Sequence, residues 1–544
     1  MALQKNKIYR AEIVDYTADG SGVARIDGMA VFVPRAAVGD QCDIRIVKVN
    51  RNMAFGRLER CIIPSRDRIE PACPVAEKCG GCCFQHISYE AELRAKEKKV
   101  ADALRRLGGV ENVLTGITGA PEITHYRNKA QYPVGQDENG TFTGFYRPRS
   151  HEIVCTGRCL IQNERADRLA AAVCAWMDEF HIPAYDEHTG KGLIRHIYVR
   201  TGAVSGETHL CLVATRAKLP AYEALIKRLT AAEPSLTGIV VNVNKRTDNV
   251  ILGERTVPLW GEETLQDSLC GNVFRLSPHA FYQVNHDQTE RLYACALEFA
   301  GLTGQETVID LYCGAGTITL ALAAKAGRVI GVEIVPEAVE NARENAARNG
   351  CENVEFLCAD AGQAAMLLAD RGEAPDVLTV DPPRKGLDEQ TVEAIGRMAP
   401  PRVVYVSCDP ATLGRDVKRL SAFGYQAVTA RAFDLFPRTK HVETVVLLSK
   451  GEIDSKKVRV EFSLEDMDMS DFQDKATYTQ IKDYVLEHSG LKVSNLYISQ
   501  IKRKCGLEVG KNYNLPKAED SRQPQCPPEK ENAIREAMKY FGMI

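Results

Sequence analysis

Six short apolar runs alternate with helical stretches after about residue 305, and this pattern constrains the fold more than any other feature of the chain. The runs are TVIDLYC, RVIGVEIV, VEFLCAD, DVLTVDPP, RVVYVSCDP and ETVVLLSK. Buried strands that alternate with helices are typical of a doubly wound parallel sheet. The 544 residues exceed what one hydrophobic core can hold, so we expect three or four domains in a multidomain α/β protein.

The composition is that of a globular protein. Hydrophobic residues make up 44% and charged residues 26%, which excludes a mostly disordered chain. The longest apolar runs fall far short of the roughly 20 residues that span a bilayer, and the start, MALQKNKIYR, lacks the apolar segment of a signal peptide. We therefore expect a cytoplasmic protein with no membrane partner. Its 18 cysteines indicate metal binding or catalysis for a few and burial for the rest, rather than disulfides.

Residues 1–59 are predicted to form a small β module. KIYRAEIVDYT, SGVARIDGMAVFVP and QCDIRIVKVN alternate apolar and polar residues between Asp-Gly and Gly-Asp turns, which favours a five-stranded OB-like barrel of the kind that often binds oligonucleotides. Residues 1–165 carry 25 Lys and Arg against 20 Asp and Glu, whereas the rest of the chain carries 44 against 52. This asymmetry favours an anionic partner at the N-terminal end. A cluster near the end of the module either contributes to such a surface or forms a solvated rim: Arg45, Lys48, Arg51, Arg57 and Arg60.

Four segments follow from these patterns. We expect the barrel at 1–59, a central α+β domain with clustered cysteines at 60–265, the α/β domain at 266–450 and a helix-rich extension at 451–544. Periodicity predicts helices in the extension at Tyr478–His488, Ser494–Cys505 and Glu529–Tyr540, with a Pro-rich link at Leu515–Pro528. A small winged-helix-like module that binds nucleic acid or protein and an inert packing element fit this pattern equally well.

The first α/β strand runs into a glycine turn, TVIDLYCGAGTITLALA. Such a turn lets a ligand approach the backbone. Glu333 ends the next strand, where an acid can accept ribose hydroxyls, and Asp360 follows the third strand, where it can meet an adenine amino group. The third glycine of a dinucleotide site and the lysine of a phosphate loop are both missing. The pattern therefore favours an S-adenosylmethionine (SAM) site over an NAD or ATP site.

Three reactive side chains are expected at the same edge of the sheet. Asp381 begins an Asp-Pro-Pro-Arg segment after the fourth strand, Cys408 follows the fifth strand, and Glu443 opens the last. The C5 carbon of uracil is a poor nucleophile until a thiolate adds at C6. After methylation, a base must remove the C5 proton so that the thiol can leave. We assign Cys408 as the nucleophile and Glu443 as the base.

A second cluster consists of Cys73, Cys79 and Cys82, with two glycines between the last two thiols. A metal site needs a fourth ligand, for which Cys83, Cys155 and Cys159 are candidates. The spacing suits an iron–sulfur cluster somewhat better than zinc, whose usual pattern is two Cys-x2–4-Cys pairs. Both metals remain open on spacing alone.

Many segments resemble one known family in order along residues 1–450. GSGVARIDGMAVFVPRAAVGD resembles a TRAM domain, and the other segments resemble RNA uracil-C5 methyltransferases, most of all the bacterial 23S rRNA enzymes of the RlmD/RlmCD (RumA) type. The latter segments are CPVAEKCGGCCFQHISYEAELRAK, HYRNKAQYP, FYRPRSHEIVCTGRCLIQ, LSPHAFYQVN, DLYCGAGTITL, GVEIVPEAVENARENAARNG, VDPPRKGLD, YVSCDPATLGRD and FDLFPRTKHVETVVLL.

The resemblance implies SAM-dependent formation of 5-methyluridine in 23S rRNA. We expect the protein to be a monomer. It also implies a 4Fe–4S cluster on Cys73, Cys79, Cys82 and Cys159, with Cys83 and Cys155 as non-ligands. The SAM contacts that it implies are Gln283, Tyr312, Glu333 and Asp381, the last also close to the target base. Family members that modify tRNA lack the TRAM domain and the cysteine cluster, which favours rRNA over tRNA.

Two other functions compete with this one. An amino-group methyltransferase acting on adenine or cytosine also uses an acidic-Pro-Pro motif, but usually with an aromatic residue after the prolines to stack on the flipped base. Arg384 occupies that position here, and amino methylation has no need of Cys408. A non-catalytic iron–sulfur protein that binds rRNA would not need Cys408 together with Glu443.

Overall fold

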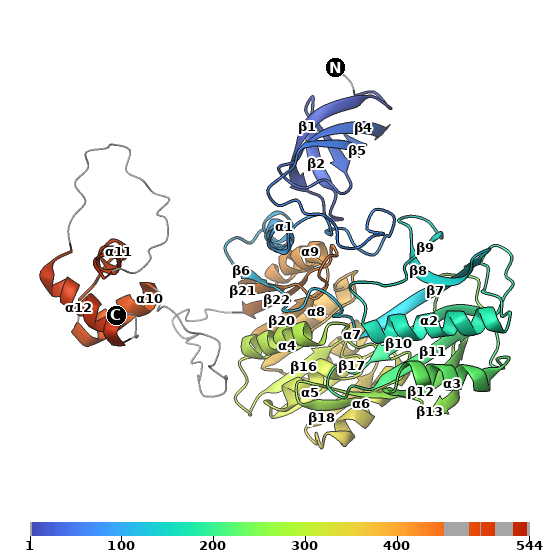
Figure 1. Ribbon diagram of the computed structural model, residues 1–544. Coiled ribbons are helices and arrows are strands. Elements are labelled where there is room, and N and C mark those ends of the chain that lie inside the picture. Colours follow the sequence, from blue (N-terminus) through green and yellow to red (C-terminus); the bar gives the residue numbers. More distant parts are fainter. Residues whose placement is uncertain (1–2, 451–477, 490, 506–525, 541–544) are drawn as a thin grey trace. The chain divides into compact units, whose positions relative to one another are not determined.

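The computed structural model describes residues 3–450, 478–489, 491–505 and 526–540 (Figure 1). The chain divides into two compact units, residues 1–453 and 454–544. In the described part of the chain, no helix is long and apolar enough to cross a membrane.

Five strands close into a barrel at the N-terminal end, which confirms the sequence prediction. They are β1 (Ile8–Tyr16), β2 (Gly22–Ile26), β3 (Met29–Val33), β4 (Gln41–Val49) and β5 (Met53–Ile63), in the order β1-β2-β3-β5-β4. Ile13, Val31 and Ile44 point into the barrel and are fully buried. Asp27 and Gly28 both have positive φ in the two-residue turn between β2 and β3, a conformation that an Asp-Gly pair favours.

Eight strands form the largest sheet, in the order β18-β17-β16-β19-β20-β22-β21-β6. The strands are β6 (Leu114–Thr118), β16 (Thr307–Leu311), β17 (Arg328–Glu333), β18 (Val354–Cys358), β19 (Val377–Val380), β20 (Arg402–Ser407), β21 (Tyr425–Phe433) and β22 (Glu443–Lys450). The pairs among β16 to β20 are parallel. Their connections contain α5 (Thr317–Ala323), α6 (Pro336–Arg348), α7 (Ala361–Asp370) and α8 (Glu389–Met398), and α9 (Pro410–Ser421) follows β20.

The sheet is not parallel throughout, which corrects the sequence prediction. β22 runs antiparallel to both β20 and β21. β21 and β22 are joined by residues 434–442 without an intervening helix, and adjacent strands joined by so short a connection run antiparallel. As a result, β22 starts at the edge where the parallel strands end, and Glu443 lies at that edge.

Residues 89–118 join the largest sheet rather than the central one. β6 pairs with β21 at the outer edge. α1 (Tyr89–Ala103) and a π-helical turn at Leu104–Gly108 pack against α9, with Val100 and Leu104 in the core. The segment 60–265, predicted as one central domain, therefore contributes to two sheets.

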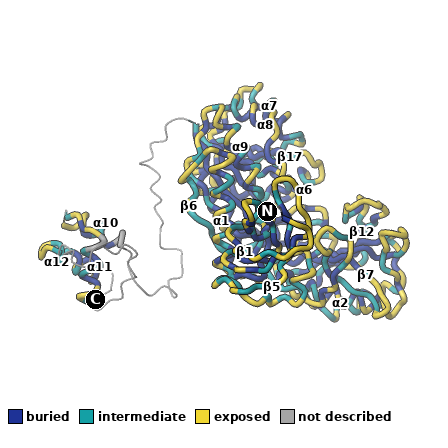
Figure 2. Tube along the Cα trace, turned by 90° about the horizontal axis from the view of Figure 1, so that it is seen from above, coloured by how far each residue is buried: buried dark blue, intermediate teal, exposed yellow. Residues whose placement is uncertain are grey.

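A seven-stranded sheet forms the rest of the central region, in the order β13-β12-β11-β10-β7-β8-β9. Its strands are β7 (Lys129–Asp137), β8 (Gly140–Tyr146), β9 (Ile153–Cys155), β10 (Ile194–Thr201), β11 (Thr208–Ala214), β12 (Leu236–Val243) and β13 (Arg255–Gly261). α2 (Glu164–Glu179) and α3 (Tyr222–Ala232) pack on it, and every residue of β10 and β11 is buried. Figure 2 shows the buried segments of the first unit in dark blue. A hairpin of β14 (Leu265–Leu269) and β15 (Asn272–Leu276) leads to α4 (His286–Ala300).

The second unit contains α10 (Tyr478–Ser489), α11 (Asn495–Lys504) and α12 (Pro528–Tyr540). Ile481, Val485, Ile498, Ile501 and Ile534 form its buried core. Most of the predicted Pro-rich link lies outside the described residues. The winged-helix-like arrangement stays a prediction, because only helices are found in the described part of this unit.

Candidate active site

The turn after β16 leaves its backbone open at the carboxyl edge of the largest sheet. Tyr312, Gly314 and Gly316 all have positive φ, at +69°, +56° and +84°. A Cβ placed on Gly314 would meet no heavy atom within 4 Å. A glycine turn at this edge therefore has room for a ligand against its backbone.

Glu333 and Asp360 follow on one side of this turn, at the ends of β17, which neighbours β16, and of β18, the next strand outward. Glu333, the last residue of β17, accepts hydrogen bonds from the N–H groups of Gly314 (3.0 Å), Ile334 (2.9 Å) and Val335 (3.0 Å). Asp360 follows β18 and caps α7 through its Oδ1 atom. Both carboxylates keep lone pairs for a ligand, since each carboxylate oxygen can accept about two hydrogen bonds.

Asp381 comes directly after β19, and no described residue donates a hydrogen bond to its carboxylate. Burial, with a smaller contribution from Asp310, raises the pKa of Asp381 to about 7. Sequence reasoning gave Asp310 no role, yet this buried side chain accepts the hydroxyls of Thr319 and Thr379, both at 2.6 Å. A desolvated carboxylate without donors favours a ligand that carries positive charge or N–H groups.

The acceptors at this edge fit SAM, which has ribose hydroxyls, amino groups and a sulfonium. Tyr312 lies in the turn itself, with its hydroxyl 3.4 Å from that of Thr391. Gln283 precedes α4 and is 9% exposed. No described residue hydrogen-bonds its side-chain amide. The contacts of Gln283, Tyr312, Glu333, Asp360 and Asp381 with SAM stay predictions.

Cys408 and Glu443 face each other at the same edge. Ser407 pairs with Thr444 across the antiparallel strands β20 and β22. The next position of this register places Cys408 opposite Glu443. Residues opposite each other in an antiparallel pair have Cα atoms about 4.5–5.5 Å apart and side chains on the same face of the sheet.

The electrostatics link Cys408, Glu443 and Asp381. Burial, followed by Asp381, raises the pKa of Glu443 to about 8, and Arg384 opposes this shift. Burial, followed by Glu443 and Asp381, raises the pKa of Cys408 to about 12, again against the effect of Arg384. Both groups are therefore protonated at neutral pH in the free protein. Arg384, to which the sequence analysis assigned no task, is the cation that favours their ionised forms.

One cavity of about 360 Å³ contains Cys408, Glu443 and Arg384 in its wall. Thr156 and Gln162 also line it, and each has a buried oxygen with no hydrogen-bond partner. Buried polar atoms are normally paired. A cavity with unpaired oxygens beside a thiol and a carboxylate suits a polar ligand.

The four cysteines of the proposed ligand set line this same cavity. Cys73, Cys79 and Cys82 belong to the loop before α1, and Cys159 to the loop before α2. After burial, the charges of the other three thiols are among the causes that raise the pKa of Cys82 to about 12. Two loops that are far apart in the sequence therefore bring four thiols together.

Cys83 and Cys155, the other two candidates, do not line the cavity. Cys83 lies against the barrel, where a Cβ on Gly20 would come within 2.8 Å of its Sγ. Cys155 is exposed at the end of β9.

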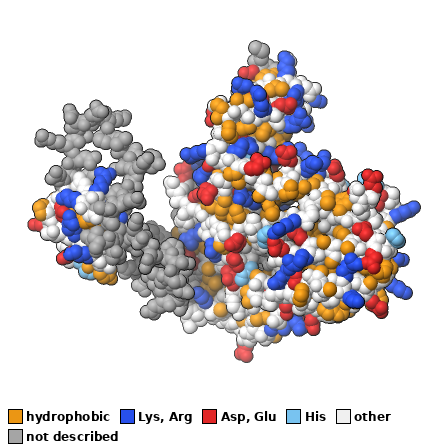
Figure 3. Space-filling view, in the orientation of Figure 1, with side chains coloured by type: hydrophobic (Ala, Val, Ile, Leu, Met, Phe, Trp, Pro, Cys, Tyr) orange, Lys and Arg blue, Asp and Glu red, His pale blue; other side chains and the backbone are white. Residues whose placement is uncertain are grey.

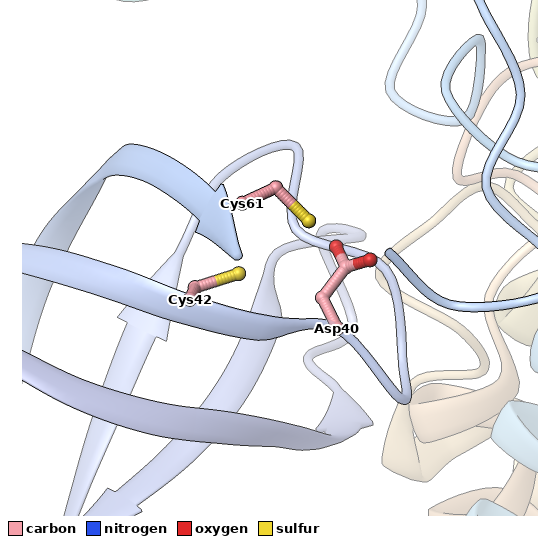
Figure 4. A group of neighbouring side chains, drawn as sticks. All are labelled: Asp40, Cys42 and Cys61. Carbon is pink, nitrogen blue, oxygen red and sulfur yellow. The ribbon is translucent and has the colours of Figure 1, made fainter. Parts of the chain in front are cut away.

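The four thiols fit a centre larger than a single zinc ion. Zn–S bonds of about 2.3 Å hold tetrahedral thiolates within roughly 4 Å of one another. Among the described residues, only Asp40, Cys42 and Cys61 of the barrel form a group of three or more possible ligands within 4.8 Å (Figure 4). Arg68 and the N–H groups of Ala37 and Ser65 already bind both Asp40 oxygens, which disfavours a cation there.

A second, larger cavity of about 780 Å³ shares Cys79, Cys82, Thr439 and His441 with the first. Five basic residues line it against two acids, Asp19 and Glu77. The basic residues are Arg35, Lys78, Arg147, Arg149 and Lys440. The positive groove therefore leads to the cavity that holds Cys408.

The barrel arginines are largely neutralised. Arg10 and Arg60 pair with Asp43, and Arg45 and Arg57 pair with Glu59. In Figure 3, basic and acidic side chains accordingly lie next to one another on the barrel.

Arg127 and Lys129 are two further basic residues of the central region. Arg127 lines the smaller cavity. Lys129 is half-buried, and burial, with Arg200 and Arg127, lowers its pKa to about 8. In the groove, Arg147 pairs with Glu152 (2.9 Å), whereas the side chains of Lys78 and Arg149 form no ion pair with a described residue.

Two family models match the chain. The model described as tRNA (uracil-5-)-methyltransferase matches residues 88–451, and the TRAM domain model matches residues 2–58. The first match begins at α1, in agreement with the packing of residues 89–118 on the largest sheet.

Curated relatives match residues equivalent to most of the first unit. An RNA methyltransferase of Halalkalibacterium halodurans is 46% identical over 447 residues, which cover 82% of this chain and 98% of the relative. One from Clostridium acetobutylicum is 43% identical over 451 residues, with the same coverage. Among solved structures, the Pyrococcus abyssi tRNA (uracil-54, C5)-methyltransferase in complex with S-adenosyl-L-homocysteine is 27% identical. Its TM-score is 0.66, and the match covers 81% of this chain and all of that one.

Proposed function

Because this chain belongs to the tRNA (uracil-5-)-methyltransferase family, we propose that it methylates C5 of a uridine in 23S rRNA with SAM as the methyl donor. The observation that carries this proposal is that Cys408 and Glu443, next to the Ser407–Thr444 pair at the end of their strands, line one cavity. Bound SAM supplies an electrophilic methyl group at this edge of the sheet.

The thiol of Cys408 first loses its proton to solvent and then reacts as a thiolate. Its Sγ forms a bond to C6 of uracil, and the C5–C6 π electrons move toward C5 and O4. C5 then forms a bond to the methyl carbon as the sulfonium–methyl bond breaks. Arg384 favours the thiolate, because it lowers the pKa of Cys408 against burial.

Glu443 completes the reaction. Its carboxylate takes the proton from C5, the C5–C6 double bond forms again, and the C6–S bond breaks to release Cys408. The carboxylate must be ionised for this step. Its pKa of about 8 is already close to the working pH, where a general base is most effective.

The four-cysteine site is proposed to hold a 4Fe–4S cluster on Cys73, Cys79, Cys82 and Cys159. The thiol donor set and the spacing wider than zinc requires support this assignment. Bound metal would join the loop before α1 to the loop before α2 and so stabilise one wall of the cavity.

The substrate RNA is proposed to enter along the basic groove. Phosphates of the strand that flanks the target uridine would contact Lys78, Arg147 and Arg149, while the extruded base occupies the smaller cavity. Arg45, Arg57 and Arg60 are less suited to this role, because acidic neighbours on the barrel already pair with them.

A tRNA substrate is the second candidate. The similar Pyrococcus abyssi enzyme is a tRNA methyltransferase, and its match covers 81% of this chain. Because the match covers so much of this chain, it weakens the expectation that a tRNA enzyme would lack the TRAM domain and the cysteine cluster. The family assignment is the same for both substrates.

The experiment is incubation with SAM and 5-fluorouridine-substituted 23S rRNA or tRNA. Attack by Cys408 on C6 and methylation at C5 proceed, but fluorine at C5 prevents proton removal and traps a covalent adduct. We expect an adduct with 23S rRNA that maps to Cys408. An adduct with tRNA alone would support the second candidate, and none with either RNA would contradict the mechanism.

A further inference from the structure

The loop that leads to Glu443, residues 434–442, is held along its whole backbone. Carbonyl groups from Asp434 to Lys440 accept hydrogen bonds from four other parts of the first unit. The donors are Gln288 to Asp434 (3.0 Å), Asn285 to Leu435 (3.1 Å), Lys96 to Phe436 (3.1 Å), Tyr126 to Pro437 (3.0 Å), the Cys83 and Phe84 N–H groups to Arg438 (2.9 and 3.1 Å), and Lys99 to Lys440 (2.9 Å).

Lys96 is the buried centre of this arrangement. Its side chain on α1 is 1% exposed and forms ion pairs with Glu92 (2.6 Å) and Asp434 (2.7 Å), both fully buried. The Arg438 N–H donates to Glu92 at 2.7 Å, and the Arg438 guanidinium lies 3.7 Å from the same carboxylate. The charges of Lys96 and Arg438 therefore balance those of the two carboxylates where α1 meets the loop. Buried ion pairs of this kind specify an arrangement more than they stabilise a fold.

The loop also forms part of the reaction cavity. Phe436, Thr439 and His441 line the cavity together with Cys408, and the loop ends at Glu443. Cys408, in contrast, follows β20 and does not belong to this loop. An altered path of the loop would therefore displace Glu443 and leave Cys408 in place.

We propose that Lys96 is a positioning residue for the methyl-transfer reaction. By binding Asp434 and the Phe436 carbonyl, it fixes the path of residues 434–442 and so holds the Glu443 carboxylate where it can reach the C5 proton. This inference rests on the proposed function, in which Glu443 is the base. Lys96 itself lies outside the cavity and affects the reaction only through the position of Glu443.

The test uses the charge-balanced double variant Glu92→Gln/Lys96→Met. It removes one anion and one cation, and the amide oxygen of the introduced glutamine can still accept the Arg438 N–H. Because misplacement of a catalytic group by about 1 Å can cost roughly 100-fold, we expect kcat to fall about 10- to 100-fold. SAM affinity should stay unchanged, and a methylated RNA–protein adduct should accumulate during turnover, since proton removal is the slowed step.

Lys98→Met is the matched control, because Lys98 lies on the same helix and is half-exposed. It should behave as the wild type. A purely structural role of Lys96 would reduce SAM binding, adduct formation and methylation in parallel, and that result would overturn the inference. A double variant with the kcat of the wild type would also overturn the inference.

Tyr126→Phe provides a second test that does not alter buried charge. It removes one donor to the loop, at the Pro437 carbonyl. We expect a smaller loss of kcat, about threefold to tenfold, again with accumulated adduct. An unchanged kcat would contradict the inference, and this test remains valid if the double variant does not fold. If the wild-type protein itself forms no 5-methyluridine, the proposed function fails, and this result is distinct from a failure of the positioning role.

Discussion

Cys408 lies opposite Glu443, one position beyond the Ser407–Thr444 pair of strands β20 and β22. β20 is the last strand of the parallel part of the sheet, and β22 runs in the opposite direction. The proposed nucleophile therefore lies at the end of one strand and the proposed base at the start of its neighbour. The strand pairing sets the register of the two residues, and the loop 434–442 leads directly into Glu443.

The two reactive residues should fail differently when they are substituted. Cys408→Ala should bind SAM and RNA but form no covalent adduct, because no nucleophile remains. Glu443→Gln should still attack and methylate, then stall before proton removal, so that a methylated RNA–protein species accumulates. Denaturing gels with labelled SAM distinguish these outcomes. Loss of activity in Glu443→Gln without a trapped species would contradict its assignment as the base.

Turnover should increase with pH between about 7 and 9. Burial and Asp381 raise the pKa of Glu443 to about 8, so below this pH the carboxyl group is mostly protonated and cannot accept the C5 proton. Single-turnover rates of 5-methyluridine release across this range test the expectation. A rate independent of pH would show that proton transfer to Glu443 does not limit release.

Glu443→Gln should stabilise the folded protein above pH 5. A carboxyl group whose pKa is raised on folding binds its proton more tightly in the folded state, so folding stability is lost as pH rises from the unfolded pKa to the folded pKa. For Glu443 this window runs from about 4.5 to about 8. At about 1.4 kcal/mol per pKa unit, the glutamine variant should gain at most about 4 kcal/mol near pH 8. Thermal unfolding at pH 5 and pH 8 should show a Tm difference that grows with pH.

The cysteine site should contain iron. Protein purified without oxygen should be brown, and Cys73→Ser should lose iron and lower the Tm, because bound metal joins two loops. Cys155→Ser is the control, since Cys155 is exposed outside the cavity, and it should retain both colour and iron. Metal analysis that finds one zinc ion per colourless chain would contradict the cluster.

The basic groove should dominate the salt dependence of RNA binding. Each lost phosphate contact flattens the slope of log K against log salt by about 0.7–0.9. Lys78→Ala/Arg149→Ala, at two groove residues without an ion pair to a described residue, should therefore flatten the slope by about 1 to 2, with SAM affinity unchanged. Arg57→Ala should have little effect, because Arg57 is paired with Glu59 on the barrel. The opposite ranking in filter-binding titrations would place the RNA on the barrel instead.

Deletion of residues 451–544 should leave RNA binding and methylation largely intact. The chain divides at residue 453, and the two family models match residues 2–58 and 88–451, so neither match extends into residues 454–544. Deletion of residues 1–59 is a harsher change. It exposes Phe84, which packs against Tyr16, and leaves Arg68 without Asp40. Loss of rRNA binding on deletion of the tail would contradict the assignment of the RNA surface to the first unit.

Local sequence patterns determined most of the secondary structure. The strand before the glycine turn, the five barrel strands and the helix that begins at Tyr478 all lie where alternation or helical periodicity predicts them. Each pattern reports burial within one short segment, which the segment itself encodes. The placement of Glu333 and Asp381 at one edge could be predicted for the same reason, since parallel strands end at a common edge.

Tertiary structure decided what no segment encodes, namely which segments become neighbours. The antiparallel direction of β22 places Glu443 opposite Cys408, and β6 leaves the central region to join the largest sheet. Lys96 reads in the sequence as one charge of an ordinary amphipathic helix, yet it is buried against Asp434, 338 residues away. Periodicity reveals that a residue is buried or exposed, but the partner of a buried charge depends on long-range packing. For this reason the residues proposed to react could be selected from the sequence, whereas the contacts that hold them in place appeared only in the fold.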